Sequence, residues 1–320
     1  AAVRALGRRG LAAGPGGRAY LAEDCSPGTY NRSQYLALNL LGKTLRFTTD
    51  ISDLGCGCIA AFYLTSMRQN PNRSSCMDYY CDASSLCGES CAEIDVQQAN
   101  AHAWRSALHG RADAAGLAAG RGGGGAGWSG PRNWTAAEYG PGARCIDTRQ
   151  PFEVAASFPV DASGSLVAMK VTLSQPGSPC PLSVTLDNYP GMSELSSALL
   201  AGMTPVVSYG RSAGPLRPDA EGPCAEDAPD ACAGRARFYS FSLHPVGSRK
   251  LRAHEHPTAD PQVRARQARR QAGVFLDVAK ALAAASQRLV AEGHGPVALI
   301  GAVVLALLAA AAGVGALLCR

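Results

Sequence analysis

The segment "SLVAMKVTLS", residues 165–174, alternates apolar and polar side chains. Val167, Met169, Val171 and Leu173 recur at every second position. Successive side chains of a strand point to opposite faces of a sheet, so this period of two predicts a strand with one buried face. Turn residues stand on either side of it, in "DASG" (161–164) and "QPG" (175–177).

The chain between Ala19 and Val246 repeats this character. The other short strand-like segments are "TLRFTTDIS" (44–52), "IAAFYLTSM" (59–67), "FEVAASFPV" (152–160), "LSVTLD" (182–187), "TPVVSY" (204–209) and "RFYSFSLHPV" (237–246). Two brief helices are expected, one after Gln98 and one across 192–201. Many short strands separated by turns predict an all-β sandwich rather than alternating βαβ units.

The charge pattern argues against a nucleic-acid partner. The 320 residues carry a formal net charge of only +5, and much of the basic excess lies between Arg249 and Arg270, outside the strand-like region. Nucleic-acid-binding domains gather such charge on one folded face. The Gly/Ala-rich segment 110–130 lacks the Gly-Lys-Ser/Thr end of a phosphate-binding loop and is expected to be a flexible surface loop.

Twelve cysteines indicate a disulfide framework. Zinc is the competing explanation, but the spacings between Cys76 and Cys91 do not form paired C-x2-C knuckles. The sequons at Asn31, Asn72 and Asn133 are glycosylation candidates and favour the secretory route. Eleven cysteines precede residue 250, so at least one is expected to stay free or to pair outside the chain. We expect no metal and no cofactor.

The C-terminal part predicts a membrane anchor. The uncharged run from Val297 to Cys319 is 23 residues long, and a bilayer-spanning helix needs about 20 such residues. A cleaved tail for a lipid anchor is an alternative. The basic residues before the run favour a cytosolic body, whereas the cysteines and sequons favour the extracellular face, which we expect.

The chain is thus expected to divide into five parts. Residues 1–18 are low-complexity and expected to be disordered, and 19–246 form the β-sandwich. Residues 247–272 are a basic polar linker, 273–295 a juxtamembrane amphipathic helix, and 296–320 the transmembrane helix. Without a signal peptide, the chain is expected to be N-terminally incomplete.

The candidate site lies in "CAEIDVQQAN", residues 91–100. Glu93 and Asp95 are two apart and share a face of an extended chain, while Gln98 stands three residues further on. Hydrolysis of a glycosidic bond needs two carboxyl groups, one as nucleophile and one as acid/base. Five extended residues span about 16 Å, so positions 93 and 98 converge only if the strand is bulged or bent.

The stretch "EIDVQQAN" resembles the Glu-x-Asp-x-x-Glu-Ala-Asn signature of glycoside hydrolase family 7. The segments "LRFTTDISDLGCGCIAAFYLTSM" (45–67), "YCDA" (80–83), "GMTPVVSY" (202–209) and "RFYSFSL" (237–243) are also similar to that family. The resemblance covers about residues 19–246. It implies a concanavalin-like jelly-roll sandwich whose concave sheet binds β-1,4-glucan such as cellulose, as in cellobiohydrolases and endoglucanases, which hydrolyse it with retention.

The resemblance also implies roles for four residues. Glu93 would be the nucleophile, Asp95 would support it, Gln98 occupies the acid/base position, and His109 would line the cleft. In the structural alternative, Asp95 caps a turn and His109 ends a helix as a favourable cation.

The amide at position 98 cannot donate or take the proton. Acid/base help is worth about 10²–10⁴-fold, so cellulose is expected to react very slowly, and Gln98→Glu to raise its hydrolysis about tenfold or more. The chain is then an active or former glucanase, a membrane-tethered carbohydrate-binding pseudoenzyme, or a non-functional fragment.

Two further departures from the family concern glucan binding and the sheet edge. Gly210 and Arg211 stand near the family's sugar-stacking tryptophan, and Leu216-Arg217 replaces a Leu-Trp pair. The family's N-terminal strands have no expected counterpart before Ala19, which would leave an exposed sheet edge. Trp104, Trp128 and Trp134 are expected to serve either as aromatic binding surface or as core.

Overall fold

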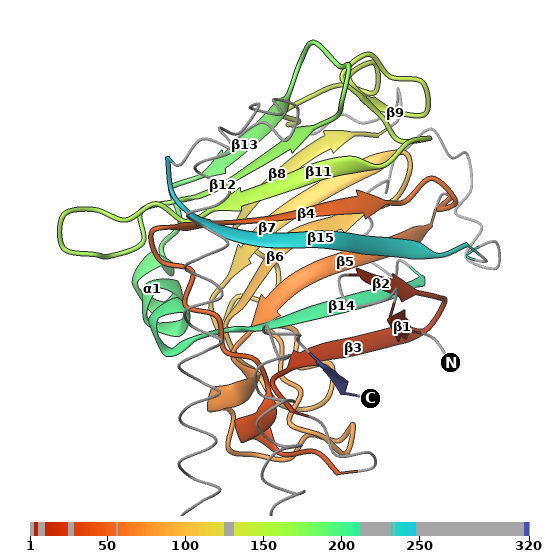
Figure 1. Ribbon diagram of the computed structural model, residues 1–320. Helices are drawn as coiled ribbons and strands as arrows, with labels where there is room; N and C mark the ends of the chain where they lie inside the picture. The colour runs from red at the N-terminus through yellow and green to blue at the C-terminus, as the bar shows by residue number, and fades with distance from the viewer. Residues whose placement is uncertain are drawn as a thin grey trace, which may run out of the picture. The chain divides into compact units, whose positions relative to one another are not determined.

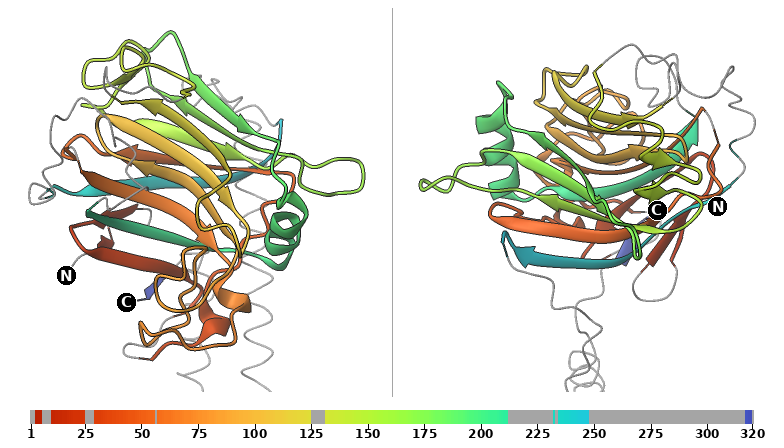
Figure 2. Two further views of the ribbon diagram at one scale, coloured as in Figure 1. Left: turned by 180° about the vertical axis from the view of Figure 1, so that it is seen from behind. Right: turned by 90° about the horizontal axis from the view of Figure 1, so that it is seen from above.

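The computed structural model describes residues 3–5, 10–24, 29–55, 57–124, 131–211, 232, 234–247 and 317–319. Their strands form two antiparallel sheets packed face to face (Figures 1 and 2). Sheet A has the order β1-β2-β15-β4-β11-β12-β13, and sheet B has the order β16-β3-β14-β5-β6-β7-β8. The predicted all-β sandwich is therefore confirmed.

Sheet A consists of β1 (Val3–Ala5), β2 (Gly10–Ala13), β4 (Lys43–Asp50), β11 (Phe152–Ser157), β12 (Met169–Ser174), β13 (Leu182–Leu186) and β15 (Ala236–Pro245). Met169, Val171 and Leu173 of β12 are buried, whereas Lys170 is exposed. From Met169 onward this is the predicted alternation, with one face of β12 toward the core and the other toward solvent. Val167, which was predicted to lie on the buried face, precedes β12 and is 40% exposed.

Sheet B consists of β3 (Gly17–Ala22), β5 (Cys58–Thr65), β6 (Glu93–Ala99), β7 (Ala103–His109), β8 (Ala118–Gly123), β14 (Thr204–Arg211) and β16 (Leu317–Cys319). Nearly every residue of β5 and all seven of β7 are buried, on both faces of the sheet. One face packs on sheet A around Phe62, Ile94 and Leu108. The other carries a smaller cluster that includes Tyr20, Tyr63 and Tyr80.

The remaining elements are short. They are the 3-10 helices η2 (Arg32–Gln34) and η3 (Met67–Gln69), the paired strands β9 (Tyr139–Gly140) and β10 (Ile146–Asp147), and the helix α1 (Met192–Ala201). Helix α1 was predicted and buries Leu195 and Leu199, which lie one turn apart on its inner face. The helix predicted after Gln98 is wrong, because that segment is strand β7.

Four disulfides between described cysteines confirm the predicted framework. Cys76–Cys87 and Cys81–Cys91 hold the segment 66–92, which we call the disulfide loop. Cys145–Cys180 and Cys58–Cys232 join more distant segments. Cys25, Cys56 and Cys224 lie outside the described residues, so the expected unpaired cysteine stays a prediction. The four bonds indicate an oxidising compartment.

The structure corrects two predictions about weakly patterned segments. Residues 1–18 were expected to be disordered and to lie before the sandwich, but β2 pairs with β15 in sheet A and β3 pairs with β14 in sheet B. The Gly/Ala-rich segment 110–130 was expected to be a loop, but Ala118–Gly123 within it pairs with β7 as β8. Residues 125–130 lie outside the described residues.

The predicted transmembrane helix over 296–320 is wrong at its end. Leu317–Cys319 is strand β16, which pairs antiparallel with β3. Residues 296–316 lie outside the described residues, as do 248–272 of the linker and all of the predicted amphipathic helix 273–295. Within the described part of the chain, no helix has the length and apolar character that crossing a bilayer requires.

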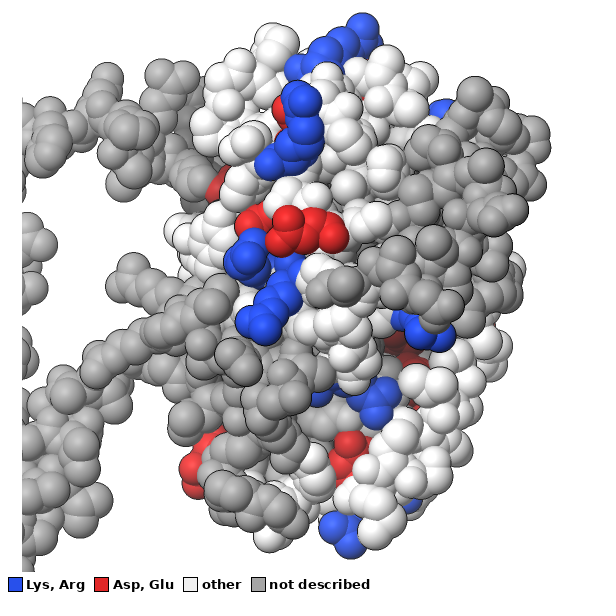
Figure 3. Space-filling model, turned by 90° about the vertical axis from the view of Figure 1, so that its right-hand side faces the viewer, with Lys and Arg blue, Asp and Glu red and all other residues white. Residues whose placement is uncertain are grey.

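The surface shows the mixed charge that the sequence predicted for the folded part of the chain. On the face shown in Figure 3, Lys and Arg side chains are interspersed with Asp and Glu side chains. The sequon residues Asn31, Asn72 and Asn133 are all exposed, so an attached glycan would meet solvent.

Candidate active site

A bulge in β6 brings the predicted site residues to one face of sheet B. Asp95 pairs with Ala107 of β7, but Gln98 pairs with Arg105, so β6 uses three steps where β7 uses two. The same shift occurs against β5. Positions 93 and 98 are an odd number apart, and the extra residue restores a common face for them. The bulge that the spacing required is therefore present.

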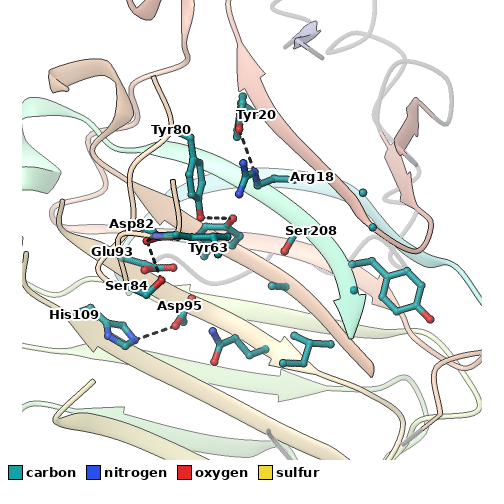
Figure 4. A pocket seen from close by; sticks show the side chains of 18 of the residues that line it. Arg18, Tyr20, Tyr63, Tyr80, Asp82, Ser84, Glu93, Asp95, His109 and Ser208 are labelled. Atoms are coloured by element: carbon teal, nitrogen blue, oxygen red, sulfur yellow. Dashed lines mark hydrogen bonds and ion pairs between the residues drawn. The ribbon is translucent and has the colours of Figure 1, made fainter. Parts of the chain in front are cut away.

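Glu93, Asp95, Gln98 and His109 line a single pocket on this face (Figure 4). Its volume is about 560 Å³, within the usual range for small-ligand sites. Strands β3, β5, β6, β7 and β14 form its floor, and the disulfide loop forms part of its wall. The loop residues in the lining are Tyr80, Asp82, Ser84 and Leu86.

Glu93 is held with its carboxylate in an unfavourable environment. Its Oε2 accepts a hydrogen bond of 3.0 Å from the backbone N–H of Ala83. Burial, and then the negative charges of Asp95 and Asp82, raise the pKa of the Glu93 carboxyl well above its usual range, and the Ala83 N–H only partly opposes this. A carboxyl with a strongly raised pKa in a cleft is typical of a functional site.

Asp95 and His109 form a buried pair. His109 Nε2 lies 3.1 Å from Asp95 Oδ2, and His109 Nδ1 lies 2.8 Å from the carbonyl oxygen of Asp113. Both acceptors lack protons when Asp95 is ionised, so both ring nitrogens donate only when the imidazole is protonated. Burial disfavours that charge, but the hydrogen bond and charge of Asp95 outweigh it and raise the pKa of His109. His109 ends a strand, and Asp95 lies within one, so neither has the alternative role considered from the sequence.

Arg105 is a site residue that the sequence did not indicate. Its side chain is only 1% exposed, and its Nη1 donates a hydrogen bond to Gln98 Oε1. The same nitrogen lies 3.5 Å from Asp95 Oδ2, and Nη2 donates to the carbonyl oxygen of Ala115 over 3.2 Å. An arginine within the apolar run "AWRSALH" (103–109) is the one sequence signal for it, because a buried arginine needs acceptors around it.

Tyrosines and an arginine extend the pocket beyond the carboxylates. The guanidinium carbon of Arg18 lies 3.7 Å from the ring centroid of Tyr80, and the hydroxyls of Tyr63 and Tyr80 are 3.0 Å apart. Tyr20 donates a hydrogen bond to Asp78 of the disulfide loop over 2.6 Å. These residues were also missed, because isolated tyrosines carry no sequence pattern that separates a cleft from a core.

The tryptophans do not serve the pocket. Trp104 and Trp134 are buried in the core between the sheets, and Trp128 lies outside the described residues. Gly210 and Arg211 line the pocket. The sequence comparison predicted that these two residues stand near the position of the family's sugar-stacking tryptophan. Residues 216 and 217 lie outside the described residues. Within the described ranges, no group of His, Cys, Asp and Glu side chains could hold a metal ion.

Comparison with known proteins extends this picture. No protein-family model matches the chain. Endoglucanase 1 of Pyricularia oryzae is 27% identical over 190 residues, which cover 50% of this chain and 43% of that relative. The match thus spans less than half of the relative's length.

Solved structures of similar fold are glycoside hydrolases. An endoglucanase I complexed with cellobiose has a TM-score of 0.56 and 18% identity, covering 76% of this chain and 78% of that one. The native endocellulase EGI of Humicola insolens has a TM-score of 0.54 and 19% identity, with 75% and 77% covered. A GH7-family cellobiohydrolase of Daphnia pulex has a TM-score of 0.51 and 16% identity, with 75% and 79% covered. The chain therefore has the fold of the family-7 endoglucanases and cellobiohydrolases, as the signature around Glu93 predicted.

Proposed function

We propose that the chain is a glycoside hydrolase of the family-7 type that acts on β-1,4-glucan, with retention and with little activity on unactivated substrates. The observation that carries this proposal is the common face of Glu93, Asp95 and position 98, which the β6 bulge creates in one pocket. The solved endoglucanase I complexed with cellobiose supports β-1,4-glucan as the substrate class.

In this proposal Glu93 is the nucleophile. Its ionised carboxylate attacks the anomeric carbon and forms a glycosyl–enzyme bond as the leaving group departs with the bonding electrons. The Ala83 N–H fixes one oxygen of the Glu93 carboxylate. Asp95, which is held by His109, supports the Glu93 side chain from the neighbouring position of the strand face. The raised pKa of Glu93 means that this attack needs a pH above the usual range for a glutamate.

Because of Gln98, the rate of the first step should depend on whether the leaving group needs a proton. An amide cannot protonate a departing alkoxide, and it cannot deprotonate the water that releases the second product. Loss of this assistance costs about 10²–10⁴-fold in rate. Fluoride departs without a proton, so an activated glycosyl fluoride avoids the first of these defects.

The test compares cellobiosyl fluoride with cellulose. We expect measurable, Glu93-dependent release of fluoride and near-background release of sugar from cellulose. Glu93→Gln is the matched variant, because it keeps the size of the side chain and an oxygen for the Ala83 N–H. Fluoride release that is equal in the folded parent and in Glu93→Gln would contradict the proposal.

The second candidate is a carbohydrate-binding pseudoenzyme. It is favoured by the hydrogen bond between Arg105 and Gln98, which holds an amide at the position where catalysis needs a carboxylic acid. This candidate predicts binding of cello-oligosaccharides by calorimetry without turnover of either substrate. A non-functional fragment would give neither binding nor turnover.

We further propose that the protein enters the secretory pathway and carries glycans at Asn31, Asn72 and Asn133. The four disulfides between described cysteines and the exposed sequons support this. Expression in eukaryotic cells should give a protein whose electrophoretic mobility increases after enzymatic deglycosylation. Recovery from the cytosol with unchanged mobility would argue against both assignments.

A further inference from the structure

Arg105 and Gln98 stand directly opposite each other on neighbouring strands. They are cross-strand partners of β7 and β6 at the point where the bulge ends. Arg105 is almost fully buried, and its Nε has no hydrogen-bond partner in the part of the chain that the structure describes. Its charge is therefore met by Gln98 Oε1, Asp95 Oδ2 and the Ala115 carbonyl oxygen.

This contact determines which way the Gln98 amide points. Arginine has only donors, so the atom of Gln98 that faces it must be the carbonyl oxygen. The NH₂ group of Gln98 then lies on the other side of the amide, and Gln98 lines the pocket. Among the described residues, no hydrogen bond engages that NH₂ group. The pocket thus presents a donor at the acid/base position.

We propose that Arg105 is a positioning residue that fixes Gln98 as a hydrogen-bond donor toward an oxygen of the bound glycoside, and that it would keep any carboxylate at position 98 ionised. The first half rests on the proposed function, because it assumes a glycoside in the pocket. The second half follows from the placement of the guanidinium alone.

The second half rests on electrostatics. A guanidinium within hydrogen-bond distance favours the ionised form of a carboxyl group and lowers its pKa. Glu93 and Asp95, on the same face of β6, would act in the opposite direction. Arg105 outweighs them because it donates directly to position 98, whereas Asp95 is already paired with His109 and Arg105. A general acid must instead hold its proton at the working pH, which glycosidases achieve by raising the pKa of that group. Gln98 and Arg105 are therefore two separate obstacles to acid catalysis at this site.

This changes the expectation drawn from the residue pattern. With Arg105 in place, Gln98→Glu creates a partly buried ion pair rather than an acid, and we expect no tenfold rise in cellulose hydrolysis. Removal of both obstacles is needed. Arg105→Met removes the charge while keeping much of the side-chain volume, and Arg105→Lys keeps the charge as the matched control.

The kinetic test measures hydrolysis of cello-oligosaccharides by Gln98→Glu, by Gln98→Glu/Arg105→Met and by Gln98→Glu/Arg105→Lys. We expect the Met double variant to exceed Gln98→Glu about tenfold or more, with a rate that falls at alkaline pH as the introduced carboxyl loses its proton. The Lys double variant should resemble Gln98→Glu. A full rise in Gln98→Glu alone would overturn the proposal. So would the absence of any rise in a folded Met double variant that still cleaves cellobiosyl fluoride.

A second measurement needs no turnover. A ¹³C-carboxyl NMR titration of Gln98→Glu should place the pKa of the introduced carboxyl below that of an ordinary glutamate, about 4.3. A value at or above that level would overturn the role of Arg105, whatever the activity. Absence of Glu93-dependent fluoride release would instead overturn the proposed function and, with it, the role toward the glycoside.

Discussion

Glu93 shows the conflict between stability and function at the scale of a single residue. Its carboxyl is raised in pKa by burial and by two neighbouring acids, so ionising it at neutral pH costs folding free energy. Asp95 Oδ1 is buried and has no hydrogen-bond partner among the described residues, which leaves an acceptor for a proton on position 93. A buried carboxyl that costs folding free energy and lines a cleft is typical of a functional site.

The first prediction follows from the sign of this pKa shift. Because the folded-state pKa of Glu93 is raised, its proton stabilises the fold below the unfolded pKa of about 4.3, and that stabilisation is lost as pH rises through the folded pKa. Glu93→Gln removes this loss. We expect the variant to gain about 1–2 kcal/mol over the parent at neutral pH and almost nothing at pH 4, measured by urea unfolding. A variant less stable than the parent at neutral pH would contradict this.

Residue-scale prediction from sequence reached only the residues with a motif. Glu93, Asp95, Gln98 and His109 stand in a family signature, and the structure places all four in one pocket. Arg105 was missed because its importance comes from pairing with a strand seven residues earlier, which local sequence does not encode.

At the scale of the element, β6 depends on one extra residue. The odd spacing of positions 93 and 98 required a bulge, and Val96 is the residue that the register shift inserts. Val96 lies buried in the core between the sheets, and Gln97 also points inward, donating to Thr49 Oγ1 over 3.1 Å. Because Val96 and Gln97 both point inward, Glu93 and Asp95 before them and Gln98 after them all point outward into the pocket.

The second prediction concerns this bulge. Deletion of Val96 makes the separation of positions 93 and 98 even, so a regular strand without the bulge still keeps Gln98 on the face of Glu93 and Asp95. We expect the folded deletion variant to bind cello-oligosaccharides and to release fluoride. Val96→Ala is the control, because it keeps the extra residue and should lose about 2 kcal/mol of stability but retain both activities below its melting temperature. Loss of both activities in a folded deletion variant would contradict the explanation of the site by a common strand face.

Other elements show where local patterns mislead. Strands β12 and β13 were predictable because one face meets solvent and the period of two is visible. A helix was predicted after Gln98, where the structure has β7. This segment contains good helix formers, Ala, Arg and Leu, but pairing with β6 and β8 overrides that preference. The Gly-rich β8 carries no propensity for a strand and is held by its neighbour and by close packing against Trp134.

At the scale of the whole molecule, one disulfide links the two sheets covalently. Cys58, at the start of β5 in sheet B, is bonded to Cys232, which lies shortly before β15 in sheet A. The sequence separation of 174 makes this the longest loop closed by a described disulfide. Closure of a long loop restricts the unfolded chain most strongly. Composition predicted that disulfides exist, but the pairing depends on the folded arrangement.

The third prediction measures that contribution. Replacement of both cysteines, Cys58→Ala/Cys232→Ala, should lower the free energy of unfolding by about 5 kcal/mol, as expected for a loop of this length. The matched control is Cys76→Ala/Cys87→Ala, whose sequence separation of 11 predicts about 3 kcal/mol. Urea unfolding under non-reducing conditions provides both values. A larger loss for the short loop would contradict the chain-entropy explanation.

The identity of the nucleophile can be tested by trapping its covalent intermediate. The protein would be incubated with an activated 2-deoxy-2-fluoro-cellobioside, whose fluorine slows both steps while its leaving group needs no acid. Because Gln98 cannot activate water, we expect the glycosyl–enzyme to accumulate, with intact mass increased by one fluorocellobiosyl group and peptide mapping that assigns it to Glu93. A folded protein that stays unlabelled, or one labelled equally after Glu93→Gln, would contradict the assignment of this pocket as a retaining glycosidase site.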